Sequence, residues 1–395
     1  MKDAKKTKTR EYISKKVRST SPSGIRKFFD ILNSLEGVIS LGVGEPDYIT
    51  PWHIREAGIY ALEKGYTSYT SNYGLIELRE ELARSLKSRM DVDYDPTTEL
   101  LITVGVSEGL DVALRAILDP GDEVIIHEPG YVSYTTCIHL AGGVSVPVPT
   151  TIDNDFKVKA KDIEAMVTPM TKAIILGYPS NPTGAVMDRK ELLKIAEIAE
   201  RYDLIVISDE VYERLVYGIK HANFASLPGM RKRTIYLSGF SKSYAMTGWR
   251  IGYAAAPAEF IEAMMKVHQY TIMCAPTIAQ MAALEALRQG ETQVQEMVDD
   301  YNQRRRLMVD GLNRVGLPCH MPHGAFYAFP SIKATGMSSD EFAERLLREA
   351  RVAVVPGSTF GSCGEGYIRC CYATSMAEIE EALERIDKFV RKHRP

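Results

Sequence analysis

The chain has 395 residues, 45% of them hydrophobic and 25% charged, which suits a soluble globular protein of two or three domains. A formal net charge of −3 gives no general electrostatic reason to bind nucleic acid or membranes, and no segment is apolar and long enough to span a bilayer. The six cysteines form neither a disulfide framework nor a zinc pattern, so we expect a cytoplasmic protein with no metal site.

The first fifty residues are predicted to form a basic arm and a helix over Gly24–Leu35 that pack with a smaller C-terminal domain. The arm lacks the apolar core of a secretory signal. It is either a binding arm or a solvated lead-in to the helix. Cap residues then predict a helix from Thr50 and Pro51 to near Gly65, followed by an amphipathic helix over Leu75–Met90.

From about Glu99, apolar runs typical of strands alternate with helical patterns, within a large domain placed at residues 51–290. The expected strands are Leu100–Val104, Glu123–His127, Val144–Val148, Ala173–Leu176, Leu204–Ser208, Thr234–Leu237 and Ile251–Ala255. The expected helices between them include Glu108–Leu118, Asp162–Val167 and Arg189–Tyr202. This alternation predicts an α/β fold with a mostly parallel, seven-stranded, doubly wound sheet. The last connection is too short for a helical crossover, so the last strand is expected to be antiparallel.

Two long helical stretches follow, over Glu259–Arg288 and Gln293–Val315. The remainder mixes short strands with helices, which predicts a small α+β domain at residues 291–395. Its expected elements are the strands Ala325–Phe329 and Tyr367–Cys371 and the helices Asp340–Ala350 and Ala377–Lys392.

The segment SGFSKSYAMTGWRIGY places Lys242 just after a predicted strand and Arg250 eight residues later. A lysine held among small residues near other cations has a lowered pKa, and its neutral amine can form a Schiff base with an aldehyde. The planar fork of an arginine suits a phosphate. An aldehyde and a phosphate on one ligand indicate pyridoxal phosphate, although Lys242 alone could equally be an ordinary solvated lysine.

Ligands of such sheets bind beyond the carboxyl ends of the strands, and three further motifs lie there. Asp209 ends a buried strand, where it could pair with a protonated pyridine nitrogen, with Tyr212 near the ring's phenolic oxygen; the alternative is a helix N-cap. Asn181, in the turn motif SNPTG, could bond the same oxygen or simply belong to a loop. Tyr131 or Tyr134 could stack on the ring or belong to the core.

The turn TVGVSEGL joins a strand to a helix, so its backbone N–H groups at Ser107, Glu108 and Gly109 are candidates for a phosphate cradle. The Glu108 carboxylate must then point away from the phosphate. Arg369 lies inside an apolar strand and needs an anion, either a substrate carboxylate or an internal salt bridge. Gly44 could bring its backbone close to the same substrate.

The order and spacing of GEPD, SNPTG, SDEVYE, SGFSKSYAMTGWRIGY, GAFYAFP, VAVVPGSTFG and IRCCYATS resemble the class I and II aminotransferases, which are fold-type I pyridoxal phosphate enzymes. The likeness covers nearly the whole chain and is strongest to archaeal-type aspartate and aromatic aminotransferases. It implies a Schiff-base and proton-transfer role for Lys242, with Asp209 on the pyridine nitrogen. It implies further cofactor contacts for Tyr69, Ser107, Glu108, Gly109, Tyr131, Asn181, Tyr212, Ser241 and Arg250, and substrate contacts for Gly44, Asn181 and Arg369.

Tyr69 matches a tyrosine that reaches the phosphate of the neighbouring subunit, which implies a homodimer with shared sites. The resemblance implies ping-pong transamination between an amino acid, aromatic or aspartate, and 2-oxoglutarate. Val106 occupies a position where some aspartate-specific relatives have lysine, which weakens a strict aspartate assignment. The alternatives are a β-eliminating lyase on the same fold and a non-catalytic pyridoxal phosphate-binding regulator. A Rossmann dehydrogenase is disfavoured because no GxGxxG follows the first strand.

Overall fold

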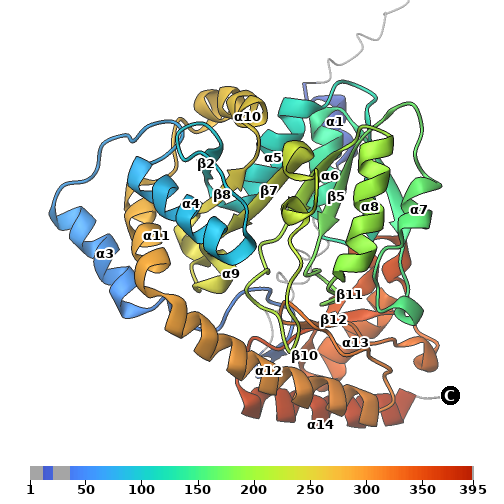
Figure 1. Cartoon of the computed structure of the whole chain (residues 1–395). Coiled ribbons are helices and arrows are strands. Elements are labelled where there is room, and N and C mark those ends of the chain that lie inside the picture. Colours follow the sequence, from blue (N-terminus) through green and yellow to red (C-terminus); the bar gives the residue numbers. More distant parts are fainter. Residues whose placement is uncertain (1–11, 21–35, 394–395) are drawn as a thin grey trace, which may run out of the picture.

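A computed structural model describes residues 12–20 and 36–393 of the chain. A seven-stranded sheet between helices forms its larger part, and a smaller body of helices and short strands lies below the sheet in Figure 1. The sheet has the order β2-β8-β7-β6-β5-β3-β4. Its strands are β2 (Leu100–Thr103), β3 (Glu123–Glu128), β4 (Val144–Pro149), β5 (Thr171–Gly177), β6 (Ile205–Asp209), β7 (Thr234–Gly239) and β8 (Gly252–Ala255).

The strand directions confirm the predicted sheet. The strands from β7 to β4 pair in parallel, whereas β8 is antiparallel to both of its neighbours, β7 and β2. The chain between β7 and β8 contains only the short helix α9 (Phe240–Ser243) and a single 3₁₀ turn, too little for a crossover that would return the chain in parallel.

Helices cover both faces of the sheet because alternate strand residues point to opposite faces. On one face, Ile126, Ile175 and Ile207 pack in a core shared with α5, α6 and α10. On the other face, α8 packs over the β5 side and α4 and α11 pack over the β2 side. The helices of this part are α3 (Trp52–Glu63), α4 (Ile76–Met90), α5 (Gly105–Ile117), α6 (Ser133–Ala141), α7 (Ala160–Glu164), α8 (Arg189–Arg201), α10 (Ala258–Thr271) and α11 (Thr277–Gln289).

Two helical regions differ from expectation. The single helix predicted over Glu259–Arg288 is two helices, α10 and α11, and Pro276 caps the second. Proline has no N–H and clashes with a preceding turn, so it starts a helix readily but does not continue one. Helix α6 is absent from the predicted elements, and its N-cap Val132 makes no side-chain cap hydrogen bond. The helix predicted over Gly24–Leu35 lies outside the described residues.

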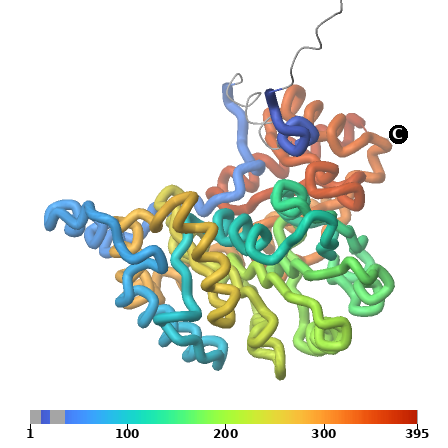
Figure 2. The backbone as a smooth tube through the Cα atoms, turned by 90° about the horizontal axis from the view of Figure 1, so that it is seen from above, coloured from blue at the N-terminus to red at the C-terminus, as the bar shows by residue number. Residues whose placement is uncertain are grey.

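The smaller body contains α12 (Glu291–Arg314), α13 (Ser339–Ala350) and α14 (Met376–His393) around a separate core. Its strands are β9 (Tyr327–Ala328), β10 (Val352–Ala353), β11 (Val355–Pro356) and β12 (Ile368–Cys371). In Figure 2 this red C-terminal part gathers at one side of the molecule, away from the light-blue α3. None of the helices within residues 12–20 and 36–393 is long and apolar enough to cross a membrane.

The N-terminal segment contacts both parts of the molecule. Strand β1 (Ile39–Ser40) pairs in parallel with β10 of the smaller body. The short helix α1 (Lys15–Ser19) instead lies against α6, where the Ser19 hydroxyl is 3.0 Å from Nε2 of His139. The described part of the N-terminal segment therefore contacts the smaller body through β1 and the larger part through α1.

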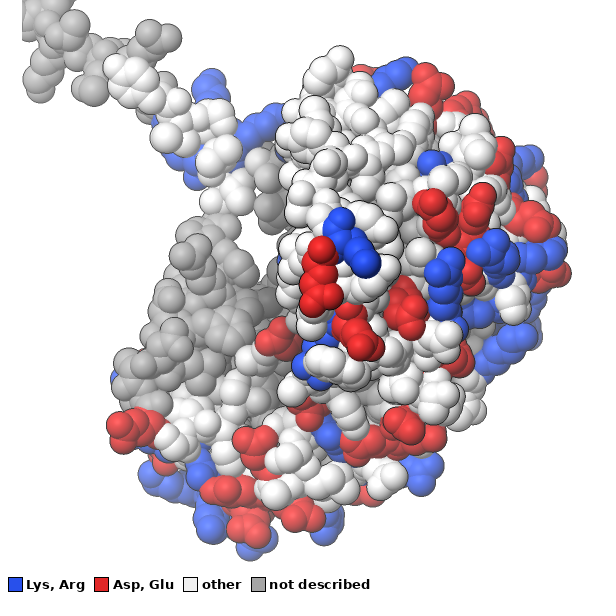
Figure 3. Space-filling model, turned by 90° about the vertical axis from the view of Figure 1, so that its left-hand side faces the viewer, with Lys and Arg blue, Asp and Glu red and all other residues white. Residues whose placement is uncertain are grey.

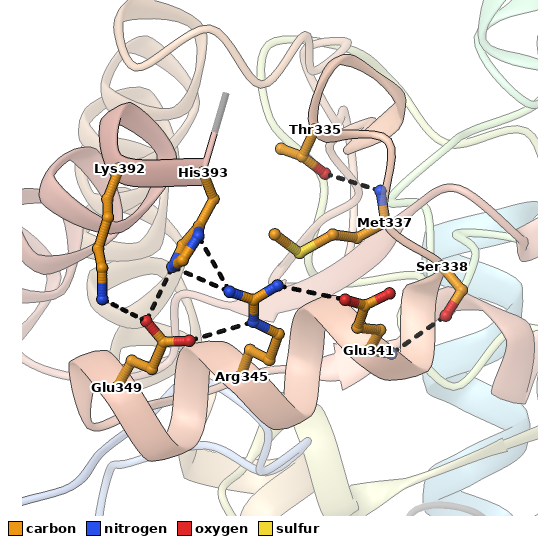
Figure 4. Close-up of polar contacts among 8 residues, drawn as sticks. All are labelled: Thr335, Met337, Ser338, Glu341, Arg345, Glu349, Lys392 and His393. Carbon is orange, nitrogen blue, oxygen red and sulfur yellow. Dashed lines mark hydrogen bonds and ion pairs between the residues drawn. The ribbon is translucent and has the colours of Figure 1, made fainter. Parts of the chain in front are cut away.

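An ion-pair cluster joins α13 to the end of α14 (Figure 4). Arg345 contacts Glu341 and Glu349 on its own helix and Nδ1 of His393 across the interface, at 3.0 Å. Glu349 also accepts hydrogen bonds from Lys392 and His393, both at 2.8 Å. These charges hold down the end of the C-terminal helix.

Candidate active site

A cavity of about 430 Å³ opens at the carboxyl ends of β5, β6 and β7. The N-terminus of α5 forms another wall, and Tyr327 of β9, Arg369 of β12 and the loop at residues 42–45 close it from the smaller body's side. The predicted site residues that line the cavity are Gly44, Ser107, Tyr131, Asn181, Asp209, Tyr212, Ser241, Lys242, Arg250 and Arg369. Segments far apart in sequence thus meet where open parallel sheets bind ligands.

Lys242 lies in α9, immediately after β7, and its Nζ donates a hydrogen bond to the Gly44 carbonyl at 2.5 Å. The ammonium also lies over the ring of Tyr212, 5.8 Å from its centroid. Burial lowers the pKa of Lys242 from 10.5 to about 8, and the nearby Arg369 charge acts in the same direction. About a tenth of this amine is therefore neutral, and nucleophilic, at pH 7, far more than for a lysine with the ordinary pKa.

Asp209 ends β6 and is buried, and the Tyr134 hydroxyl donates a 2.8 Å hydrogen bond to its Oδ2. Burial raises the pKa of Asp209 to about 6, against the opposing effect of the Tyr134 hydrogen bond. Gly177 makes room for this pair, because a Cβ at that position would lie 2.2 Å from the Tyr134 hydroxyl oxygen. Within the described residues no lysine or arginine forms an ion pair with Asp209, so the carboxylate suits a cationic ligand atom.

The start of α5 and Arg250 form a candidate anion site. Gly105 has φ +74°, and a Cβ there would lie 2.6 Å from Nη2 of Arg250, so only glycine allows this approach. The first N–H groups of a helix have no partner within the helix. In α5 the Val104 N–H is taken by the Glu108 carboxylate, which leaves the N–H groups of residues 105–107 for an anion. Ser241 lines the same cavity.

Arg369 is 2% exposed and lies between two aromatic rings, with its Cζ 4.5 Å from the Tyr327 centroid and 5.0 Å from that of Phe360. Its Nη1 donates to Oδ1 of Asn181 at 2.9 Å and its Nη2 to the Gly42 carbonyl at 2.7 Å. No carboxylate among the described residues pairs with it, and its Nε has no hydrogen-bond partner there. The internal salt bridge that was the alternative from the sequence is absent from the described residues, so the guanidinium is available to pair with the carboxylate of a ligand.

Tyrosines form the remaining wall of the cavity. The hydroxyls of Tyr212 and Tyr327 are 2.7 Å apart, and that of Tyr327 lies 3.4 Å from the Gly44 carbonyl. Burial raises the pKa of Tyr212 well above its usual value, so its hydroxyl stays protonated and can donate. The Tyr131 ring also lines the cavity and packs edge-on against Tyr134, at 5.6 Å between centroids.

Three predicted residues do not line the cavity. The Glu108 carboxylate points away, toward Val104 and His268, and Gly109 faces β7, where a Cβ would lie 3.2 Å from Leu237. Glu108 and Gly109 come after the residues whose N–H groups are free at the start of α5, so their own N–H groups make hydrogen bonds within the helix. Tyr69 is 80% exposed, outside this chain's own cavity.

Sequence reasoning does not assign roles to Tyr327 and Gly177, or to Tyr134 as the Asp209 partner. Tyr327 lies in the quoted segment GAFYAFP, but only the packing of the smaller body brings it to Tyr212. From the sequence, Tyr134 is a candidate only for stacking or for the core. Its hydroxyl contact to Asp209 joins residues 75 positions apart, which no local pattern shows.

The cavity fits pyridoxal phosphate. It offers a partly neutral amine at Lys242, a buried carboxylate without a cationic partner at Asp209, and a cradle of free N–H groups beside Arg250. These suit an aldehyde, a pyridinium nitrogen and a phosphate, respectively.

The fold is that of a fold-type I pyridoxal phosphate enzyme. The family described as aminotransferase class I and II matches residues 36–386. The chain belongs to this family and is a pyridoxal phosphate-dependent aminotransferase. It is 56% identical to the putative aminotransferase YugH of Bacillus subtilis, over 96% of this chain and 99% of the relative. It is 47% identical to aromatic-amino-acid aminotransferase 2 of Thermococcus litoralis, over 96% and 98% of the two chains.

The solved structures agree. An aspartate aminotransferase from Thermus thermophilus, in complex with maleate, superposes with a TM-score of 0.92 at 38% identity, covering 96% of this chain and 100% of that chain. A Pyrococcus protein superposes with a TM-score of 0.94 at 46% identity, covering 95% and 98%. The predicted family and fold class are confirmed.

Proposed function

We propose that the protein transfers an amino group between an amino acid and a 2-oxo acid by a ping-pong reaction in this cavity. The observation that carries the proposal is the convergence of Lys242, Asp209, Arg250 and Arg369, four charged groups from separate positions in the chain, around one space. The four groups have different roles. Arg250 binds the cofactor phosphate, and the Asp209 carboxylate pairs with the protonated ring nitrogen. Arg369 binds the substrate carboxylate, and Lys242 transfers protons.

Bound pyridoxal phosphate supplies an aldehyde that accepts the amino group and a cationic ring that withdraws electrons from the substrate Cα. Asp209, once paired with the ring nitrogen, keeps a proton on that nitrogen. Arg369 and Asn181 orient the substrate carboxylate, which fixes the direction of the Cα–H bond. The neutral amine of Lys242 would take the proton from Cα as a general base and then, as the ammonium, deliver it to the former aldehyde carbon of the cofactor.

The proposed substrates are an aromatic amino acid or aspartate, with 2-oxoglutarate as acceptor. Relatives carry both names, an aromatic-amino-acid aminotransferase at 47% identity and an aspartate aminotransferase of Pyrococcus abyssi at 48%. The rings of Tyr131 and Tyr327 give the cavity aromatic walls. Val106 at the cavity wall offers no charge to a second carboxylate, which favours the aromatic donor.

We further propose that the active unit is a homodimer with shared sites. Figure 3 faces the side that carries α3, and a broad area of it has few charged side chains. Large apolar side chains are exposed on α3, on the segment after it and at the end of α10, among them Tyr69 at 80% and Tyr270 at 89%. Such a surface is typical of an interface, and a second copy there would receive Tyr69 near its phosphate site.

Two other expectations also stand as proposals. The division into residues 1–50, 51–290 and 291–395 places the last boundary at the start of α12, which bridges the two cores. A cytoplasmic location is proposed because all six cysteines are free.

A donor panel tests the proposed reaction. Each amino acid is incubated with the enzyme and 2-oxoglutarate, and glutamate and the new 2-oxo acid are measured. We expect aromatic donors or aspartate to give equal amounts of both products, and Lys242→Ala to lose nearly all turnover together with the visible absorbance of bound cofactor. Ammonia and pyruvate formed without any 2-oxo acid would identify a β-eliminating lyase instead.

A further inference from the structure

A buried acid–imidazole pair lies directly behind the first turn of α5. Oε1 of Glu108 is 2.6 Å from Nδ1 of His268, and Oε2 accepts the N–H of Val104. His268 is on α10, its side chain is 0% exposed, and that of Glu108 is 10% exposed. The pair therefore fixes the carboxylate between two helices, on the side of the turn away from the cavity.

The hydrogen bonds of this pair define the form of His268. Its Nε2 is buried and has no partner among the described residues. A buried N–H without an acceptor is more unfavourable than a bare ring nitrogen, so the neutral ring with its proton on Nδ1 fits best. His268 thus donates its Nδ1–H to the Glu108 carboxylate.

This carboxylate lies close to the proposed phosphate cradle. Residues 106 and 107, just before Glu108, line the cavity, and Gly105 lies against Arg250. A carboxylate that lost its buried donor would be poorly solvated behind the turn and would rotate toward water. Ser107, the residue before Glu108, is exposed and lines the cavity, so a carboxylate that turned toward solvent on this side would face the cofactor's phosphate.

We propose that Glu108 and His268 are positioning residues for the phosphate cradle. Glu108 caps the Val104 N–H, which fixes the turn at Gly105 so that the N–H groups of residues 105–107 face the cavity. His268 holds the Glu108 charge away from the phosphate. The inference rests on the proposed cofactor site and extends it to α10, which contributes no residue to the cavity lining.

The test measures equilibrium binding to the full-length apoenzyme, with pyridoxal phosphate and with pyridoxal, which has the same aldehyde but no phosphate. His268→Leu removes the donor and fills most of the space, whereas His268→Gln keeps an N–H donor. Glu108→Gln keeps the oxygen that caps Val104 and removes the charge. Glu262→Gln is the matched control, because it removes an exposed charge from the same helix, α10.

We expect His268→Leu to weaken binding of pyridoxal phosphate by about ten-fold, the size of a partly buried charge effect at a helix N-terminus, and to change pyridoxal binding by less than about two-fold. His268→Gln and Glu262→Gln should bind like the wild type. Adding Glu108→Gln to His268→Leu should restore most of the lost affinity.

Equal weakening for both ligands, or no recovery in the double variant, would show that His268 has only a general packing role and would overturn the inference. Unchanged binding by His268→Leu would overturn it as well. A wild-type chain that binds neither ligand would instead reject the proposed cofactor site itself, so the two failures are distinguishable.

Discussion

The lowered pKa of Lys242 can be read directly from the pH dependence of cofactor capture. Burial places this pKa at about 8 instead of 10.5, so about 9% of the amine is neutral at pH 7 and about 91% at pH 9. Because only the neutral amine attacks an aldehyde, the capture rate should rise about ten-fold between these two pH values and then level off. An amine with the ordinary pKa would gain about a hundred-fold over the same range and continue to rise.

The assay mixes apoenzyme with pyridoxal phosphate and follows the visible absorbance of the bound cofactor between pH 6 and 10. Nα-acetyl-lysine amide is the matched control, since it experiences the same ionisations of pyridoxal phosphate without the burial. Arg369→Gln removes a charge that lowers the Lys242 pKa, so its midpoint should move to higher pH. A wild-type rate that climbs ten-fold per pH unit through pH 10, parallel to the control, would refute the reasoning.

Three further results are expected. Tyr134→Phe removes the hydrogen bond that lowers the Asp209 pKa, so the acid limb of the kcat/KM profile should move to higher pH. Gly177→Ala should shift the acid limb in the same direction, because the added Cβ displaces the Tyr134 hydroxyl. Tyr202→Phe, which removes a hydroxyl at the surface, is the control and should leave the acid limb where it is. Arg369→Gln should raise KM for the amino donor by about a hundred-fold, a loss typical of a buried charge-assisted contact, while pyridoxal phosphate binding is retained; loss of both would contradict a substrate role. Hydrogen bonds from Lys392, His393 and Arg345 lower the pKa of Glu349 from 4.5 to about 2. The Glu349 carboxylate therefore stabilises the fold fully above pH 4.5, and this stabilisation is lost as the pH falls toward 2. The difference in Tm between the wild type and Glu349→Gln, measured by differential scanning fluorimetry, should shrink over that pH range.

The central sheet could be predicted from the sequence because its strands, apart from the partly exposed edge strand β4, are buried on both faces. Runs such as Ala173–Leu176 are continuously apolar and separated by helical patterns, which is the local signature of a parallel sheet. The antiparallel β8 could also be predicted, since a connection length is visible in the sequence. Helix α6 could not, because its sequence SYTTCIHLA contains β-branched residues and starts without a side-chain cap.

The candidate site likewise has residues that the sequence predicts and contacts that it does not. Lys242, Asp209 and Arg369 could be proposed because a charged residue at the end of, or within, an apolar strand requires a partner. The partners themselves could not, because the contacts of Asp209 with Tyr134 and of Glu108 with His268 join residues 75 and 160 positions apart. The break between α10 and α11 has a visible cause in Pro276, but the apolar spacing on either side favours one continuous helix and hides it.

The antiparallel return from β7 to β8 has a consequence for evolution as well as for chemistry. Lys242 and Arg250 stand on one short hairpin connection whose two ends are held by the ladder between Gly239 and Gly252. The distance between the Lys242 amine and the Arg250 guanidinium is therefore set by the backbone of this connection, and not by a movement of the smaller body relative to the sheet. Insertion or deletion of a single residue in that connection would change the length of ligand that Lys242 and Arg250 can bind together. We therefore expect related proteins with this fold to differ in length at other loops.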